Sequence, residues 1–284
     1  MADLILFPSD YYNVRCVDAD FKEEYAASVA AEVWNIALFG YDQWLNEGKL
    51  VLTGVPAGKH QTVYRGWMMK PEQYRRFYTQ LMQNGIQLIT SPEEYETMHI
   101  FPNVYRYFGS DTARMKIYPL HAKIDIEDVK QSFRRFMVKD FVKSVKGTEF
   151  PGFFDQSVTQ EEFDDWMKVF YQYRGDLLTG GICIKEFLDL KQYDHKTNEY
   201  RVFYMNHIPA AISRNSGQNI LTPFPPEKLI EKYRNLPSPY YTVDFAQLSD
   251  DSWRIIEAGD GGVSGLPEGQ DPYEYYRKLF QCFR

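Results

Sequence analysis

Short apolar runs alternate with amphipathic segments over the first hundred residues. Four brief apolar runs bounded by turn-forming residues predict strands: residues 3–7, 49–53, 63–67 and 86–89. Residues 21–37 and 71–83 carry apolar side chains at helical spacing, and Ser91 with Glu94 predicts a capping box that begins a third helix. Strands that alternate with helices in this way predict a parallel α/β sheet.

The second half of the chain is richer in strands. Residues 102–136 are less regular, so we expect a lobe boundary near residues 110–125. Beyond it the pattern predicts strands at 135–142, 180–188 and 199–205, a hairpin of 240–245 and 252–257, and helices at 159–173, 226–234 and 272–283. This order of elements is typical of an α+β region that follows the α/β lobe.

Composition narrows the class of protein. The chain has 284 residues, more than one domain usually holds, and no apolar run approaches the ~20 residues that span a bilayer. We therefore expect a soluble, cytoplasmic protein with no membrane partner. The net charge of −7 argues against a general nucleic-acid binder, which carries a basic excess. Three widely spaced cysteines give no disulfide framework and no zinc spacing.

Lysines gather around residues 139–146. In a strand, alternate residues share a face, so Lys139 and Lys143 point the same way, and a glycine-containing loop with Lys146 follows. Lysine ammonium groups and loop amides together can grip phosphates. The structural alternative is a solvated edge strand, on which lysines are common.

Carboxylates gather near the C-terminal hairpin. If its two strands pair, Asp244 and Glu257 converge, and Asp260 follows one turn beyond. Three carboxylates at strand ends predict an Mg²⁺ site, because Mg²⁺ binds oxygen ligands that it shares with substrate phosphates. Asp260 beside two glycines also fits a simple turn. Glu257 lies within an apolar strand, where a carboxylate needs a partner.

Two arginines lie close to these strands. Arg201 is in the middle of a predicted strand, and Arg214 follows in the next segment. A guanidinium fork binds phosphate or carboxylate oxygens, so both arginines are candidate catalytic residues. A salt bridge to a neighbouring acid explains each of them equally well.

In their order along the chain, these segments resemble the ATP-grasp superfamily. The closest likeness is to the clade named for one conserved arginine and two lysines, and the most specific segments are VYRGWMM, VKDFVKS and IIEAGDGGVSGLP. The resemblance implies a parallel α/β pre-ATP-grasp domain at residues 1–120, followed by a two-lobed ATP-grasp fold. Its first lobe would span residues 121–188 and its second lobe residues 189–284.

The resemblance also implies roles for individual residues. Lys139 corresponds to the lysine that contacts nucleotide phosphates, Arg201 to the arginine near the transferred phosphate, and Asp244 and Glu257 to the metal-binding acids. The adenine hinge and its neighbourhood correspond to Lys185, Glu186, Phe187 and Leu188. Many members have Glu-x-Asn at the last metal strand, whereas the asparagine is absent here and Asp260 stands one residue further on. The second phosphate-contacting lysine is Lys143, Lys146 or Lys185.

The implied reaction is ligation of a carboxylate to an amine, with ATP and Mg²⁺ as cofactors. The carboxylate becomes an acylphosphate, and the products are ADP, phosphate and an amide. The substrate would be a small molecule, a peptide or a protein end, with Arg65 and Arg106 as candidate carboxylate ligands. The alternatives are a nucleic-acid end ligase or nucleotidyltransferase that forms lysine–AMP on Lys139 or Lys143, and a nucleotide-binding module without catalysis. The oligomeric state is not indicated.

Overall fold

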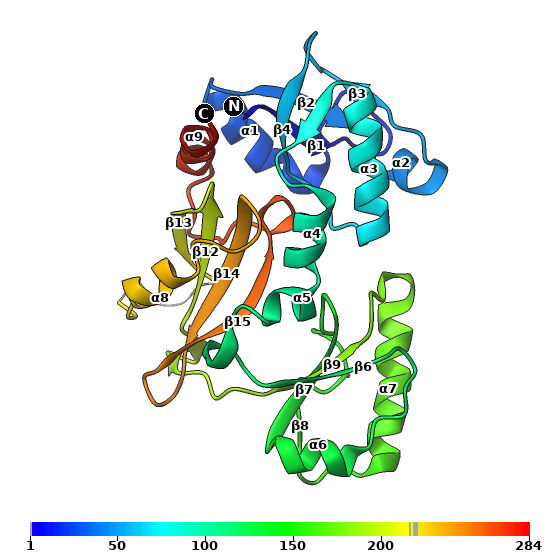
Figure 1. The fold of residues 1–284 in the computed structure, drawn as a ribbon, viewed down its shortest axis with the longest axis vertical. Helices are drawn as coiled ribbons and strands as arrows, with labels where there is room; N and C mark the ends of the chain where they lie inside the picture. Colours follow the sequence, from blue (N-terminus) through cyan, green and yellow to red (C-terminus); the bar gives the residue numbers. More distant parts are fainter. Residues whose placement is uncertain (1, 216, 218–220) are drawn as a thin grey trace.

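The N-terminal lobe is built on a five-stranded sheet in the order β3-β2-β1-β4-β5. The computed structural model describes residues 2–215, 217 and 221–284 (Figure 1). The strands are β1 (Ala2–Pro8), β2 (Asn35–Phe39), β3 (Leu52–Thr53), β4 (His60–Tyr64) and β5 (Ile86–Leu88). Only β3 runs antiparallel to its neighbour, which confirms the predicted parallel α/β lobe.

Five helices accompany this sheet: α1 (Lys22–Ala30), α2 (Tyr41–Glu47), α3 (Pro71–Gln83), α4 (Pro92–His99) and α5 (Phe101–Tyr105). Helix α3 has the predicted bounds, and Ser91 with Glu94 forms the predicted capping box of α4. The helix predicted over residues 21–37 is wrong beyond Ala30. Residues 35–39 form β2 instead, because this apolar run pairs with β1, while Val29 and Val33 are solvent-exposed.

The second sheet has the order β6-β9-β7-β8. Its strands are β6 (Met115–Tyr118), β7 (Arg135–Asp140), β8 (Phe154–Asp155) and β9 (Ile182–Glu186), and helices α6 (Ile126–Ser132) and α7 (Gln160–Arg174) cover one face. Phe136, Val138 and Ile184 point toward these helices and form a core with them. Since side chains alternate along a strand, Lys139 and Lys185 point to the opposite face.

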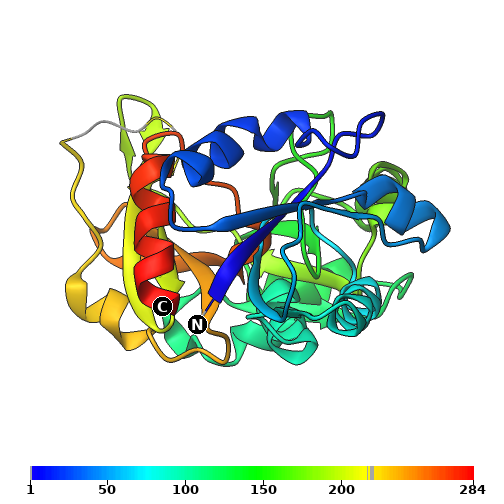
Figure 2. The same cartoon turned by 90° about the horizontal axis from the view of Figure 1, so that it is seen from above.

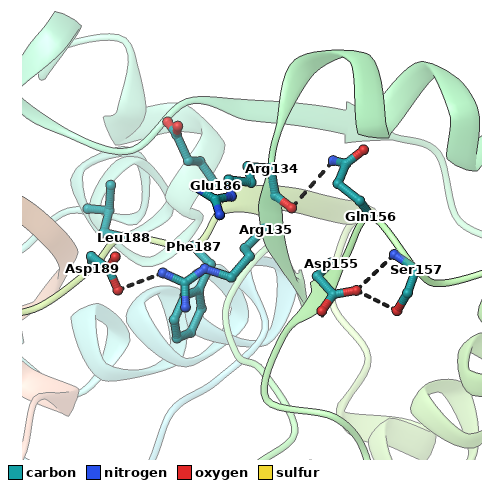
Figure 3. A pocket seen from close by; sticks show the side chains of 9 residues that line it. All are labelled: Arg134, Arg135, Asp155, Gln156, Ser157, Glu186, Phe187, Leu188 and Asp189. Atoms are coloured by element: carbon teal, nitrogen blue, oxygen red, sulfur yellow. Dashed lines mark hydrogen bonds and ion pairs between the residues drawn. The ribbon is translucent and has the colours of Figure 1, made fainter.

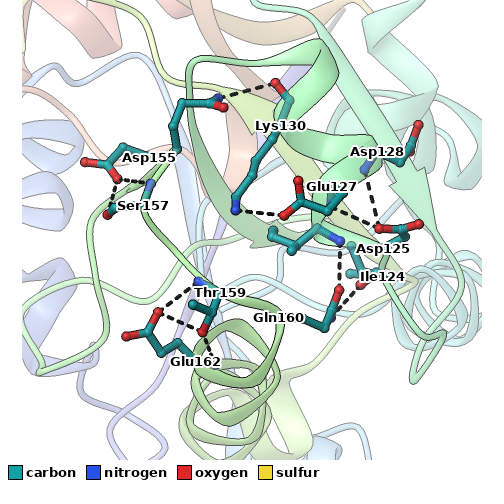
Figure 4. Close-up of polar contacts among 12 residues, drawn as sticks. Ile124, Asp125, Glu127, Asp128, Lys130, Asp155, Ser157, Thr159, Gln160 and Glu162 are labelled. Carbon is teal, nitrogen blue, oxygen red and sulfur yellow. Dashed lines mark hydrogen bonds and ion pairs between the residues drawn. The ribbon is translucent and has the colours of Figure 1, made fainter.

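Polar caps fix the two helices of this second lobe (Figure 4). Asp125 accepts the backbone N–H groups of Glu127 and Asp128, and Thr159 forms a capping box with Glu162 at the start of α7, as the sequence predicts. Gln160 joins the two helix starts, because it accepts the N–H of Ile126 and donates to the carbonyl of Ile124. Each cap satisfies backbone groups that a helix end leaves without a partner.

The third sheet is antiparallel, in the order β13-β12-β14-β15. Its strands are β12 (Glu199–Met205), β13 (Ile208–Arg214), β14 (Tyr240–Gln247) and β15 (Trp253–Asp260), and β14 and β15 form the predicted hairpin. A small hairpin of β10 (Gln192–Tyr193) and β11 (Lys196–Thr197) precedes it, and α8 (Glu227–Lys232) follows β13. The 3₁₀ helices are Ala19–Phe21, Gly109–Asp111, Gly175–Leu177 and Gly261–Val263.

The closing helix α9 (Pro272–Phe283) returns to the N-terminal lobe. It lies beside α1 and β13, where Tyr275, Tyr276 and Leu279 join a core with residues of both sheets (Figures 1 and 2).

Strand β6 begins at Met115 and pairs with β9, so the second sheet starts before the expected lobe end at residue 120. Within the described residues, no helix combines the length and the apolar character needed to cross a bilayer.

The turn into β9 contains a glycine that the fold needs for space. A Cβ on Gly181 would lie 2.4 Å from the carbonyl oxygen of Tyr118 and 2.7 Å from the ring of Phe141. We expect Gly181→Ala to lower the free energy of unfolding by about 1–3 kcal/mol, the usual cost of overpacking. The matched control is Gly152→Ala, where a Cβ meets open space. Equal urea midpoints for the two variants would contradict this packing.

Candidate functional site

Three charged residues form a row across the third sheet. Arg201 of β12 lies opposite Asp244 of β14, and Asp244 lies opposite Glu257 of β15. Directly opposed residues share a face, so all three side chains leave the sheet on the same side. Arg201 donates from Nε and Nη2 to the two Asp244 oxygens, at 2.8 and 2.7 Å, and from Nη1 to the carbonyl of Gly265. The bidentate geometry fixes both side chains.

Two lysines of the second sheet face this row. Lys139 of β7 donates to both oxygens of Glu257, at 3.0 and 2.9 Å, and Lys185 of β9 donates to the carbonyl of Ile256, at 2.5 Å. Both lysines are buried. Their ammonium groups also lie 4.6 and 4.3 Å from the ring centre of Phe101 in α5, so both cations contact the same aromatic ring. All three lobes therefore contribute to one charged centre.

The electrostatics of this centre suit an anionic ligand. Burial, together with the charge of Lys139, lowers the pKa of Lys185 to about 8 against the opposing effect of Glu257. Burial alone would raise the pKa of Glu257, but Lys139 and Lys185 outweigh it and hold that pKa below its usual value. The Glu257 side chain is still 41% exposed, so an ion from solvent can reach it. Ammonium and guanidinium groups match phosphate oxygens, and the paired carboxylates match Mg²⁺.

The remaining predicted lysines follow β7. The strand ends at Asp140, earlier than predicted, because the chain turns so that the Asp140 amide donates to the Lys143 carbonyl. Lys143 is exposed but lies within electrostatic range of the centre: desolvation and the charges of Lys139 and Arg201 lower its pKa, while Glu257 raises it. Lys146 is exposed in the following loop, and its charge also lowers the pKa of Lys143.

The structure places Asp260 away from the row. It lies three residues after Glu257, so strand alternation turns its side chain to the other face, where it is buried and accepts the N–H of Gly262 at 2.8 Å. Its second oxygen has no hydrogen-bond partner among the described residues, and burial raises its pKa to about 7. No group of three His, Cys, Asp or Glu side chains within the described ranges is placed to hold a metal ion. The expected trio of carboxylates is thus a pair, Asp244 and Glu257.

The other three candidate arginines, two for substrate and one for catalysis, are engaged elsewhere. Arg65 is buried, and its five N–H groups donate to both oxygens of Glu24 and to the carbonyls of Gly261 and Ser264. Arg106 is exposed and stacks on Tyr107. Arg214 pairs in register with Tyr200, so it lies on the sheet face opposite Arg201 and stacks on Tyr200 and Phe224. The structure brings none of the three to the row.

A cavity of about 850 Å³ opens at the hinge end of the second sheet (Figure 3). Its walls include Glu186, Phe187 and Leu188, the residues expected around adenine. Glu186 itself forms an ion pair with Arg114 at 2.8 Å, so its side chain is held at the rim. Arg135 lies 5.1 Å from the ring centre of Phe187 and donates to Asp189 at 2.6 Å, as Figure 3 shows.

Sequence reasoning missed two residues of this region. Arg135 lies four residues before Lys139 in β7, so the two side chains share a face of the strand, and the sequence was enough to predict this. Phe101 had no such signal, because its contact with Lys139 and Lys185 depends on how α5 packs against β15.

Comparison with known proteins decides the family. Residues 127–279 match the family model of an ATP-grasp domain, family 3 of the clade named for one arginine and two lysines. The chain belongs to this ATP-grasp family. The match includes both buried lysines and the whole row, and it confirms the family and the fold class that the sequence predicts. With the family comes the reaction class, an ATP-dependent carboxylate–amine ligase that uses Mg²⁺.

Solved structures share the fold of this ATP-grasp protein over nearly its full length. The ATP-grasp ligase PsnB, complexed with a minimal precursor, has a TM-score of 0.63 at 7% identity and covers 100% of both chains. The D-alanine-D-alanine ligase from Coxiella burnetii has a TM-score of 0.58 at 11% identity, covering 99% of this chain and 93% of its own. The D-cycloserine synthetase DcsG has a TM-score of 0.59 at 11% identity, covering 99% and 100%. No curated protein matches the sequence.

The buried Asp260 should make the stability of this ATP-grasp protein depend on pH. Burial raises its folded pKa from 3.8 to about 7, so between these values the folded chain holds a proton that the unfolded chain has lost. Stability therefore falls as pH rises from about 4 to about 7. We expect Asp260→Asn to remove this contribution and to stabilise the protein at pH 8 by a few kcal/mol, at about 1.4 kcal/mol per pKa unit. Urea unfolding of both proteins at several pH values measures it; parallel curves would contradict the assignment.

Proposed function

We propose that this chain joins a carboxylate to an amine at the centre formed by the row and the two buried lysines. The observation that supports this most directly is the contact between Lys139 and Glu257. It brings a phosphate-binding cation and a metal-binding carboxylate from two sheets to one point. Cations and carboxylates that converge in this way suit a magnesium–nucleotide complex better than a metal ion alone or a phosphate group alone.

The residues divide into three proposed roles. Lys139, Lys185 and Lys143 would hold nucleotide phosphates, Asp244 and Glu257 would hold Mg²⁺, and the backbone of Phe187 and Leu188 would border the nucleobase in the hinge cavity. ATP supplies the phosphoryl group that activates the carboxylate, and Mg²⁺ neutralises the phosphate oxygens. Two carboxylates suffice on the protein side, because Mg²⁺ usually completes its shell with phosphates and water.

Positioning and charge carry the chemistry that the chain itself supplies. Arg201 is held by Asp244 and the Gly265 carbonyl, so its guanidinium is oriented before any ligand arrives. A preorganised cation stabilises charge that develops on a reacting oxygen without reorganisation at the moment of reaction. No side-chain nucleophile is required. Cys183 lies on the same face as the lysines but is buried, and burial raises its thiol pKa to about 12.

The substrate is proposed only as a class. PsnB and the macrocyclase MdnC were solved with precursor peptides, whereas DcsG is a D-cycloserine synthetase. We propose a carboxylate on a small molecule, a peptide or a protein end as the acceptor here. Arg65, Arg106 and Arg214 are engaged elsewhere, so we assign recognition of the carboxylate to the exposed Lys146 in the loop after β7.

A lysine–AMP mechanism is the second candidate, and the lowered pKa of Lys185 favours it, because an unprotonated amine is a nucleophile. Product analysis separates the two functions: ligation through a phosphorylated carboxylate releases ADP, whereas a nucleotidyl mechanism releases AMP. The Lys185 ammonium already donates to the Ile256 carbonyl, which suits a phosphate-binding role.

Removal of the Glu257 charge should abolish turnover. We expect Glu257→Gln to reduce Mg²⁺-dependent ADP formation, with an acceptor panel of carboxylates and amines, by at least about 100-fold. The amide keeps the size of the side chain and one acceptor for Lys139, so circular dichroism should show an intact fold. The control is Glu96→Gln, an exposed partner of Arg75 in the first lobe. Near-normal activity of Glu257→Gln would overturn the proposed metal site.

The hinge cavity should govern nucleotide affinity rather than chemistry. Arg135→Ala removes the guanidinium that stacks on Phe187 and Phe153 and pairs with Asp189. We expect KM for ATP to rise about tenfold while kcat changes less than about threefold, because uniform binding is lost. Arg75→Ala, which removes an exposed arginine of the first lobe, is the matched control. If kcat fell and KM stayed constant, the nucleobase would not lie in this cavity.

A further inference from the structure

The turn that follows Lys139 is held by one buried carboxylate. Asp140 is fully buried. Its Oδ1 accepts the backbone N–H groups of Val142 and Lys143, at 2.7 and 2.6 Å. Its Oδ2 accepts Nε of Arg174 at 2.8 Å and the N–H of Thr179 at 3.3 Å. Four donors occupy the acceptor sites of the two oxygens, so Asp140 has no capacity left for a metal or a substrate.

These bonds set the direction of Lys143. The Asp140 amide also donates to the Lys143 carbonyl, at 2.9 Å, which closes the turn from both sides. Lys139 immediately precedes the turn and contacts Glu257, and Lys143 ends the turn as an exposed cation within electrostatic range of the same carboxylate. The turn therefore brings the cations of Lys139 and Lys143, four residues apart in the sequence, near the same centre.

The C-terminal end of α7 secures the same segment a second time. Arg174 holds Asp140, and its neighbour Tyr173 donates a short hydrogen bond from its hydroxyl to Glu149. The first contact is buried, whereas Tyr173 is exposed. The loop that carries Lys143 and Lys146 is thus fastened to the helix at its start, in the protein interior, and near its far end, at the surface.

We propose that Asp140 is a positioning residue for nucleotide binding, which acts by directing Lys143 at the phosphates. Arg174 completes the buried anchor, and Tyr173 with Glu149 holds the outer part of the loop, which carries Lys146. This inference rests on the proposed function, because Lys143 needs a phosphate to bind. Asp140 is fully buried and both its oxygens are occupied, so its effect on binding must pass through the lysine.

A double-mutant cycle tests that dependence. The affinity of Mg²⁺–ADP is measured by titration calorimetry for the wild-type chain, Asp140→Asn, Lys143→Met and the double variant. Asparagine keeps an acceptor for the two amides but breaks the ion pair with Arg174. We expect Asp140→Asn alone to weaken binding about tenfold, the worth of one charge-assisted hydrogen bond. In the Lys143→Met background the same change should weaken binding less than about twofold.

The controls separate the possible failures. Lys168→Met removes an exposed lysine of α7 and should leave the affinity unchanged. If Asp140→Asn does not fold, Arg174→Gln, which breaks the same ion pair from its other end, takes its place in the cycle with Lys143→Met, with the same expected loss of coupling. Equal effects of Asp140→Asn in both backgrounds, or no effect in either, would overturn the inference alone. A wild-type chain that binds no ADP would overturn the proposed function and the inference with it.

Discussion

The ion pair between Lys139 and Glu257 joins the second sheet to the third, and the geometry of the centre depends on it. A lysine buried between β7 and Phe101 needs an anionic partner, and Glu257 supplies both oxygens at 3.0 and 2.9 Å. The carboxylate remains partly exposed, so the pair can exchange partners without unfolding. In our account Lys139 would bind the phosphates and Glu257 would hold Mg²⁺ when the nucleotide is present. Each charge is compensated before and after binding.

The first lobe completes this arrangement through packing. Arg65 after β4 is bound by Glu24 and by the carbonyls of Gly261 and Ser264, which ties the N-terminal sheet to the loop that follows β15. Tyr276 of α9 also donates to Glu24, in a partly buried hydrogen bond. Helices α4 and α5 also pack against β15, the strand that carries Glu257. An arginine that looked like a substrate ligand therefore acts as a connection between lobes, and breaking it would leave a buried charge without compensation.

The sequence predicted the elements whose pattern is local. The helices of residues 71–83 and 272–283, the strand of residues 199–205 and the capping boxes have the expected places, because proline, cap residues and strand runs act within a few positions. The pairing of Asp244 with Glu257 followed from recognising a hairpin. Asp260 was misjudged because alternation over three residues reverses the face, and Phe101 was missed because no local pattern reports a contact between lobes. The burial of Arg65 could not be predicted from the sequence either, since its partners lie 41 and about 200 residues away.

Crystals grown with Mn²⁺ and a non-hydrolysable ATP analogue test the exchange of partners most directly, because Mn²⁺ is located by its anomalous scattering and takes the oxygen ligands that Mg²⁺ takes. The account predicts an anomalous peak between the carboxylates of Asp244 and Glu257, with the Lys139 ammonium moved from Glu257 to a phosphate oxygen. A peak remote from both carboxylates, with Lys139 still paired to Glu257 while the analogue is bound, would contradict it.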